Sequence, residues 1–149
     1  MIIFIYELAY DVLMARIVLI TCVNKKLKSK APACELYISP LFRFSLAYAR
    51  TFDPDKIFIL SAKHHLLGLD EVIEPYNKTL NNMSVKEIKE WSDIVVQRLR
   101  KVADLDDDEF IFLSGEKYMK YILPYVKNYK IPLKGLSFGK RLQFMKNRI

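Results

Sequence analysis

Cysteine is nearly absent from this chain of 149 residues, which contains only Cys22 and Cys34. Small secreted domains that depend on disulfides carry several cysteine pairs, and structural zinc sites use pairs of the CxxC kind. Eleven residues separate the two cysteines here, so neither framework fits. We therefore expect a thiol-reduced, cytoplasmic protein that is stabilised by a hydrophobic core.

Glycine and histidine are also scarce, with four and two copies. A phosphate-binding P-loop and a dinucleotide-binding fingerprint each need several glycines at fixed spacings, and the sequence has neither pattern. His64 and His65 are adjacent, which is not a spacing typical of metal sites. The sequence therefore predicts no bound metal and no cofactor.

The sequence has no run of about 20 apolar residues, the length that a membrane-spanning helix needs. Residues 1–13 are mostly apolar, but they include Glu7 and Asp11 and have no basic leader or cleavage site of a signal peptide. Met14 directly precedes a strong strand pattern and is an alternative start. We expect no membrane association, an N-terminal extension at residues 1–13 and a single domain at residues 14–149.

Three short apolar runs predict buried strands, at Arg16–Cys22, Lys56–Ser61 and Phe110–Ser114. Capping and apolar patterns between and after them predict helices at residues 39–50, 84–103, 116–125 and 139–146. Residues 61–76 are predicted to form a loop, and residues 131–133 at most a short edge strand. This alternation predicts an α/β fold: a single domain with a mostly parallel central sheet flanked by helices on both faces.

The carboxyl ends of the predicted strands indicate where a site would lie, because open α/β sheets bind ligands beyond these ends. Here the ends are Thr21-Cys22, Ser61-Ala62 and Ser114-Gly115. The lysine-rich loop, the loop with both histidines and the turn after Gly115 should therefore emerge on the same side of the sheet. We expect the segment Ser61–Tyr76 to form the floor and wall of the functional pocket.

The net charge of +7 is concentrated in two places. Residues 127–149 contain seven lysines and arginines and no acid, and the loop after the first strand contains Lys25, Lys26, Lys28 and Lys30. Basic clusters attract phosphates, so we expect nucleic acid or a nucleotide as the partner. A lysine-rich surface that serves only solubility is the alternative. The sequence specifies no oligomeric state.

Several motifs carry a resemblance to a known family. Leu60-Ser61-Ala62, followed by Leu69-Asp70 and Ile73-Glu74-Pro75-Tyr76, is similar to the Leu-Ser-Gly…Asp…Gln-Pro-Tyr stretch of the YaaA peroxide-stress proteins. Residues 16–147 resemble a smaller bacterial, archaeal and phage domain related to YaaA. The motifs that match this domain are Cys22 with Lys25 and Lys26, Leu36–Phe42, Ser61–His64 and Gly135–Arg141. His65 stands where glycine is expected. The resemblance implies DNA binding and protection from oxidative damage, or a role beside enzymes that exchange or cleave modified bases.

His64, Asp70 and Glu74 are the candidate catalytic residues. A histidine after a buried strand suits general acid–base catalysis. Asp70 or Glu74 could stabilise the positive charge that develops on a sugar when an N-glycosidic bond breaks. Structural roles remain open for these residues, namely a loop histidine held by the backbone and an Asx turn at Asp70.

Candidate substrate- and phosphate-binding residues come from the same loops and motifs. Tyr76 could stack on a base or belong to the core, and Cys22 could be a thiolate nucleophile or a buried thiol. The full set is Cys22, Lys25, Lys26, Ser39, Ser61, Lys63, Tyr76, Ser114, Gly115, Tyr118 and Arg141. Two functions fit: an enzyme that cleaves or exchanges a base at the N-glycosidic bond, or a non-catalytic DNA- or RNA-binding protein.

Overall fold

A five-stranded sheet forms the centre of the computed structural model, which describes residues 14–21 and 26–149. The strands lie in the order β4-β3-β1-β6-β7. Their bounds are β1 Arg16–Thr21, β3 Lys56–Ser61, β4 His65–Gly68, β6 Glu109–Leu113 and β7 Tyr129–Lys130. All neighbours pair in parallel except β4, which runs antiparallel to β3. The predicted α/β class with a mostly parallel sheet is confirmed.

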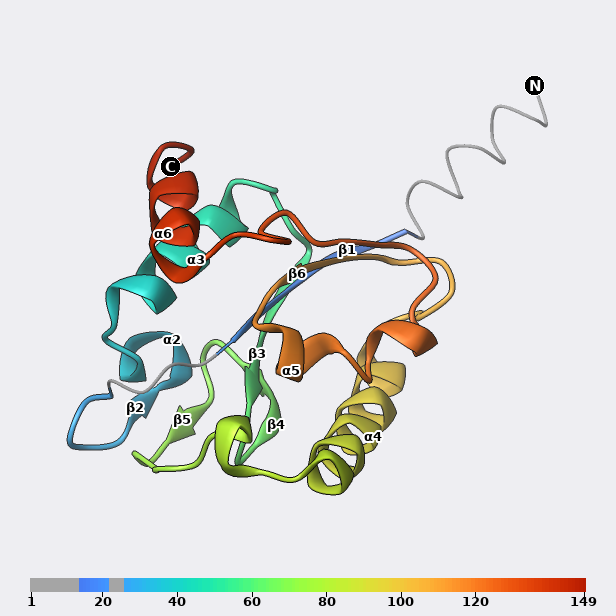
Figure 1. Cartoon of the computed structure of the whole chain (residues 1–149), viewed down its shortest axis with the longest axis horizontal. Coiled ribbons are helices and arrows are strands. Elements are labelled where there is room, and N and C mark those ends of the chain that lie inside the picture. Colours follow the sequence, from blue (N-terminus) through green and yellow to red (C-terminus); the bar gives the residue numbers. More distant parts are fainter. Residues whose placement is uncertain (1–13, 22–25) are drawn as a thin grey trace.

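The central strands are buried because helices cover both faces of the sheet. Ile17, Val18, Leu19 and Ile20 of β1 have no exposed surface. Figure 1 shows α3 (Pro40–Arg50) and α6 (Phe138–Lys146) on one side of the sheet, and α4 (Val85–Val102) and α5 (Glu116–Met119) on the other. This arrangement explains why the strand sequences are continuously apolar rather than alternating.

Two helix starts form as the sequence predicts. Ser39 caps α3 by accepting a hydrogen bond from the backbone N–H of Phe42, and Pro40 occupies the first helical position. Ser84 and Glu87 form a reciprocal capping box at the start of α4. The N-terminus of α3 faces the same cavity as the carboxyl end of β1, since Ser39, Pro40 and Thr21 all line it.

The prediction that residues 61–76 form a loop is wrong for the first half of this segment. Residues 65–68 turn back as β4 and pair with β3, so that Ser61 lies opposite His65. Leu67 of β4 is buried, and α4 packs against this strand. Farther on, β5 (Val72–Ile73) pairs with β2 (Ala31–Pro32), which precedes the short helix α2 (Ala33–Leu36). A β-hairpin therefore follows β3 where the sequence pattern indicated only breakers.

The C-terminal elements also differ in detail. The edge strand β7 lies at Tyr129–Lys130, ahead of the predicted residues 131–133. The helix predicted around residues 116–125 divides into α5 and a 3-10 turn at Leu123–Tyr125, because Pro124 cannot donate the backbone bond that would continue an α-helix. A second 3-10 turn, at Leu80–Asn82, precedes α4.

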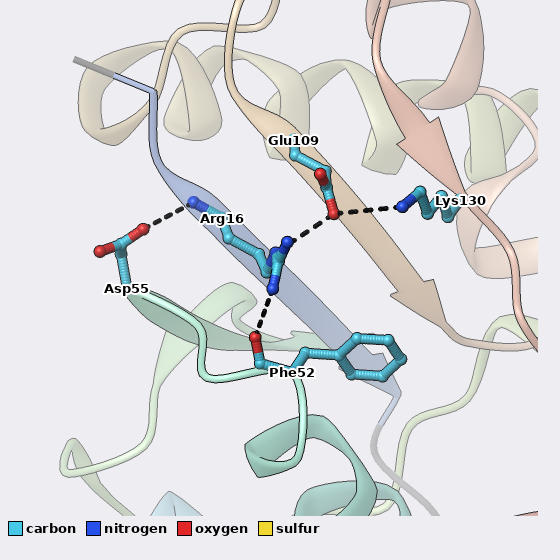
Figure 2. A network of polar contacts seen from close by, with 5 residues as sticks. All are labelled: Arg16, Phe52, Asp55, Glu109 and Lys130. Carbon is cyan, nitrogen blue, oxygen red and sulfur yellow. Dashed lines mark hydrogen bonds and ion pairs between the residues drawn. The ribbon is translucent and has the colours of Figure 1, made fainter. Parts of the chain in front are cut away.

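A polar network ties together the amino ends of three parallel strands (Figure 2). The Nε of Arg16 lies 3.2 Å from the Oε1 of Glu109, and Lys130 Nζ lies 3.8 Å from the same oxygen. Arg16 also donates to the carbonyl of Phe52 at 2.7 Å, and its backbone N–H donates to Asp55 at 2.7 Å. These charges therefore lie at the edge of the sheet opposite the carboxyl ends of the strands.

Candidate functional site

A cavity of about 770 Å³ lies at the carboxyl ends of β1 and β6. The strand ends contribute Thr21 and Ser114 to its lining, and Gly115 follows at the start of α5. The first turn of α3 and the first turn of α6 form further parts of the wall. The cavity therefore occupies the place where parallel α/β sheets bind ligands, as the strand order predicts.

Positive charge dominates the ionisable groups of the cavity lining. Lys26, Lys78, Lys117 and Arg141 contribute cations, and Glu116 contributes a carboxylate. Large apolar or aromatic side chains also line the cavity, from Leu41, Leu113, Tyr118, Leu133, Phe138 and Leu142. A cavity with apolar walls and an excess of cations favours a ligand that joins an anionic group to an apolar ring or chain.

The N-terminal turn of α6 places Arg141 at the cavity. Gly135 has a φ of +78°, a conformation that glycine adopts without steric cost, and it turns the chain into the helix. The backbone N–H of Arg141 donates to Ser137, and its Nε donates to the carbonyl of Leu136 at 3.0 Å. The Nε bond holds the guanidinium against its own turn and orients it.

Six of the predicted binding residues line this cavity. They are Lys26, Ser39, Ser114, Gly115, Tyr118 and Arg141. Cys22 and Lys25 lie outside the described residues, so the structure gives no account of them. Of the three strand-end regions expected to converge, those after β1 and β6 line the cavity.

The three predicted catalytic residues, His64, Asp70 and Glu74, do not line the cavity. The reason lies in the strand order, because the hairpin puts β4 at the outer edge of the sheet, beyond β3, whereas the cavity lies over β1 and β6. Asp70 and Glu74 are exposed. No residue of the segment Ser61–Tyr76 lines the cavity, and the expectation that this segment forms the functional pocket stays a prediction.

Ser61, Lys63 and Tyr76 belong to a neighbouring cluster that we call the tyrosine cluster, together with Tyr37 and Lys26. The hydroxyl of Tyr76 lies 2.6 Å from that of Tyr37 and 2.7 Å from the Oγ of Ser61. Lys26 Nζ lies 4.6 Å from the ring centroid of Tyr76 and 5.6 Å from that of Tyr37, and Lys63 Nζ lies 6.0 Å from Tyr76. The tyrosine cluster therefore adjoins the cavity, because Lys26 belongs to both.

His64 lies at the edge of the tyrosine cluster, with its ring 5.4 Å from that of Tyr76. Its backbone N–H donates to the Oγ of Ser61, and its carbonyl accepts from Arg98. Burial lowers the pKa of His64, and the charge of Lys63 lowers it further, while Glu71 opposes them. The imidazole is therefore mostly neutral at pH 7, and the carboxylate whose charge acts on it is that of Glu71.

His65 has a φ of +65°, in the left-handed region that favours glycine. Its ring stacks on that of Trp91 at 6.3 Å, and burial lowers its pKa, with a further contribution from Arg98. The indole of Trp91 donates to the carbonyl of Ser61 at 2.9 Å. The left-handed φ at the turn from β3 into β4 explains why glycine is expected at this position.

Residues 17–147 match the family of unknown function DUF6884. The chain belongs to this family. No curated protein and no solved structure matches the chain. The DUF6884 match includes all the residues that line the cavity. The description of the DUF6884 family names no activity, and the resemblance to the YaaA proteins stays a prediction.

Sequence reasoning missed the segment ahead of α4 that lines part of the cavity. Lys78, Thr79 and Asn81 line the cavity from the 3-10 turn before α4. Leu80 anchors this turn, because it is fully buried and its N–H donates to the hydroxyl of Tyr118. A single leucine in a polar stretch was the one local signal for this placement.

The described ranges contain no group of three or more histidine, cysteine, aspartate or glutamate side chains placed to hold a metal ion. Within the same ranges, no helix combines the length and the hydrophobicity needed to cross a membrane.

Proposed function

We propose that the protein binds a nucleotide, or one nucleotide unit of a nucleic acid, in the cavity at the carboxyl ends of β1 and β6. The observation that carries this proposal is the convergence of four cationic side chains on a largely apolar cavity. A nucleotide joins anionic phosphate to a flat base with apolar faces, and so matches both parts of the lining. The cavity volume of about 770 Å³ lies in the range of small-molecule sites.

Calorimetric titration with nucleoside monophosphates at low salt tests this proposal. Arg141→Gln should weaken binding at least about tenfold, because a charged hydrogen bond to phosphate is lost. Lys140→Gln is the matched control, since it removes the same charge one residue earlier from an exposed side chain that does not line the cavity. Absence of binding, or an equal loss in the two variants, would contradict the proposal.

Cleavage or exchange of the base at the N-glycosidic bond is a second proposal, and Glu116 favours it. A carboxylate near the sugar stabilises the oxocarbenium-like transition state of such reactions. Glu116 lines the cavity, whereas Asp70 and Glu74 do not. Glu116 would therefore take the role that the sequence pattern suggested for those two residues.

Release of free base from nucleosides, modified-base DNA and tRNA, followed by chromatography, tests the second proposal. Glu116→Gln should reduce release by roughly 10²–10⁴-fold, the usual loss for an acid–base group, and leave the fold intact. His64→Ala is the comparison, because its ring lies outside the cavity lining and the variant should retain activity. Nucleotide binding without base release from any substrate would instead support a non-catalytic nucleic-acid-binding protein.

A further inference from the structure

Two buried hydroxyl groups lie at the carboxyl ends of the neighbouring strands β1 and β6. The strand register pairs Ile20 of β1 with Leu113 of β6, and the residues that follow them are Thr21 and Ser114. Both line the cavity. Neither the Oγ1 of Thr21 nor the Oγ of Ser114 is exposed, and neither has a hydrogen-bond partner among the described residues. Ser114 as a whole is only 6% exposed.

The other buried serines of the described chain show that this pair is unusual. Ser45 donates its hydroxyl to the carbonyl of Leu41 at 2.7 Å, and Ser92 donates to Ile88 at 2.8 Å. The hydroxyl of Ser61 lies 2.7 Å from that of Tyr76. A buried polar group without a partner costs free energy, and valine or alanine would fill the same space without that cost. The two unpartnered hydroxyls thus belong to residues at which the buried strands reach the cavity.

The charges around the cavity indicate which ligand group these hydroxyls would meet. A hydroxyl both donates and accepts, but Lys26, Lys117 and Arg141 make the surroundings favour an acceptor with negative charge. Glu116 is the one carboxylate in the described lining and leaves the balance positive. Because the pair lies at the buried ends of the strands, a group that ends a molecule fits there better than one whose chain continues on both sides.

We infer that Thr21 and Ser114 form an anion subsite that binds the terminal phosphate of the nucleotide through their two hydroxyls. The inference rests on the proposed function and makes it more specific, since it selects phosphate monoesters over nucleosides and over internal phosphodiesters. The phosphate then accepts from both hydroxyls, and the surrounding cations neutralise its charge. The base lies against the apolar part of the wall.

Titration of the full chain with a nucleoside monophosphate, the matching nucleoside and inorganic phosphate tests the inference. Thr21→Val and Ser114→Ala should each weaken monophosphate binding about tenfold, because each removes a hydrogen bond to a charged group. Nucleoside binding should be weak in the wild type and unchanged in the variants. Ser92→Ala is the control, because it removes a buried hydroxyl that already has a partner, and its monophosphate affinity should equal that of the wild type.

Melting curves without ligand provide a second measurement, since both variants remove an unpartnered buried group and should melt no lower than the wild type. If the monophosphate binds the double variant as tightly as the wild type, or the nucleoside binds as tightly as the monophosphate, the subsite is refuted while nucleotide binding stands. If no nucleotide binds at all, the proposed function fails. Inorganic phosphate that binds the wild type and not the double variant would then still support the subsite, and its failure to bind would refute it.

Discussion

Replacing His65 by glycine and by alanine tests whether the backbone is left-handed at the turn from β3 into β4. A left-handed φ such as the +65° of His65 costs an L-residue with a Cβ roughly 1–2 kcal/mol, whereas glycine adopts it freely. Both variants lose the imidazole and its stacking on Trp91, so their difference isolates the backbone. We expect the glycine variant to be the more stable by about 1 kcal/mol, or roughly 2–4 °C in Tm for a domain of this size.

Urea unfolding followed by fluorescence measures this difference, because Trp91 is the single tryptophan and is buried. Circular dichroism provides a probe that does not depend on the environment of the indole. His64 is the matched control, since its φ is not positive, and there the alanine variant should be at least as stable as the glycine variant. An alanine variant at His65 that equals or exceeds the glycine variant in stability would refute the left-handed backbone.

Three further predictions concern pH, the N-terminus and salt. Both histidines have a lowered pKa in the folded chain, so the unfolded chain takes up protons first as the pH falls. The free energy of unfolding should therefore decrease below about pH 6.5, by at most about 1.4 kcal/mol per pH unit for each histidine. A variant with glutamine at both positions should lose this fall, and a pH-independent wild type would contradict it. A chain that begins at Met14 should melt within a few degrees of the full chain, because β1 pairs with β3 and β6 from residue 16 onward, and a larger loss would refute this. Lys140 and Lys146 are exposed on α6, whereas Lys127 and Lys130 pair with acids. Neutralising the first pair should therefore flatten the salt dependence of nucleic-acid binding more than neutralising the second pair, and an equal effect would contradict this.

The strands and helix starts were predictable because their signals are local. β1, β3 and β6 are continuous apolar runs, and such runs match strands that are covered on both faces. Ser39-Pro40 and the capping box at Ser84 depend on residues three positions apart or fewer. The parallel order of these strands then placed Ser114, Gly115 and the lysine-rich loop at one edge of the sheet.

The position of the cavity was predicted only in part, because it depends on which strands are neighbours. The sequence does not reveal that residues after Ser61 turn back as an edge strand, which moves His64 away from β1 and β6. The acid-free stretch at residues 127–149 likewise crosses the molecule, so that Lys130 lies with Glu109 at the amino ends of the strands and Arg141 lies at the cavity. A count of charges along the sequence does not distinguish residues at the amino ends of the strands from residues at the carboxyl ends.

The most direct test of the central claim is a nuclear magnetic resonance titration of the isotope-labelled protein with a nucleoside monophosphate. Binding in the cavity predicts that the amide signals of Thr21, Ser114 and Arg141 shift together and saturate with one affinity. The signals of Lys130 at the amino ends of the strands, and of residues 64–74 in the hairpin, should change little. Shifts centred on either of those regions, or no shifts at millimolar nucleotide, would contradict a nucleotide site at the carboxyl ends of β1 and β6.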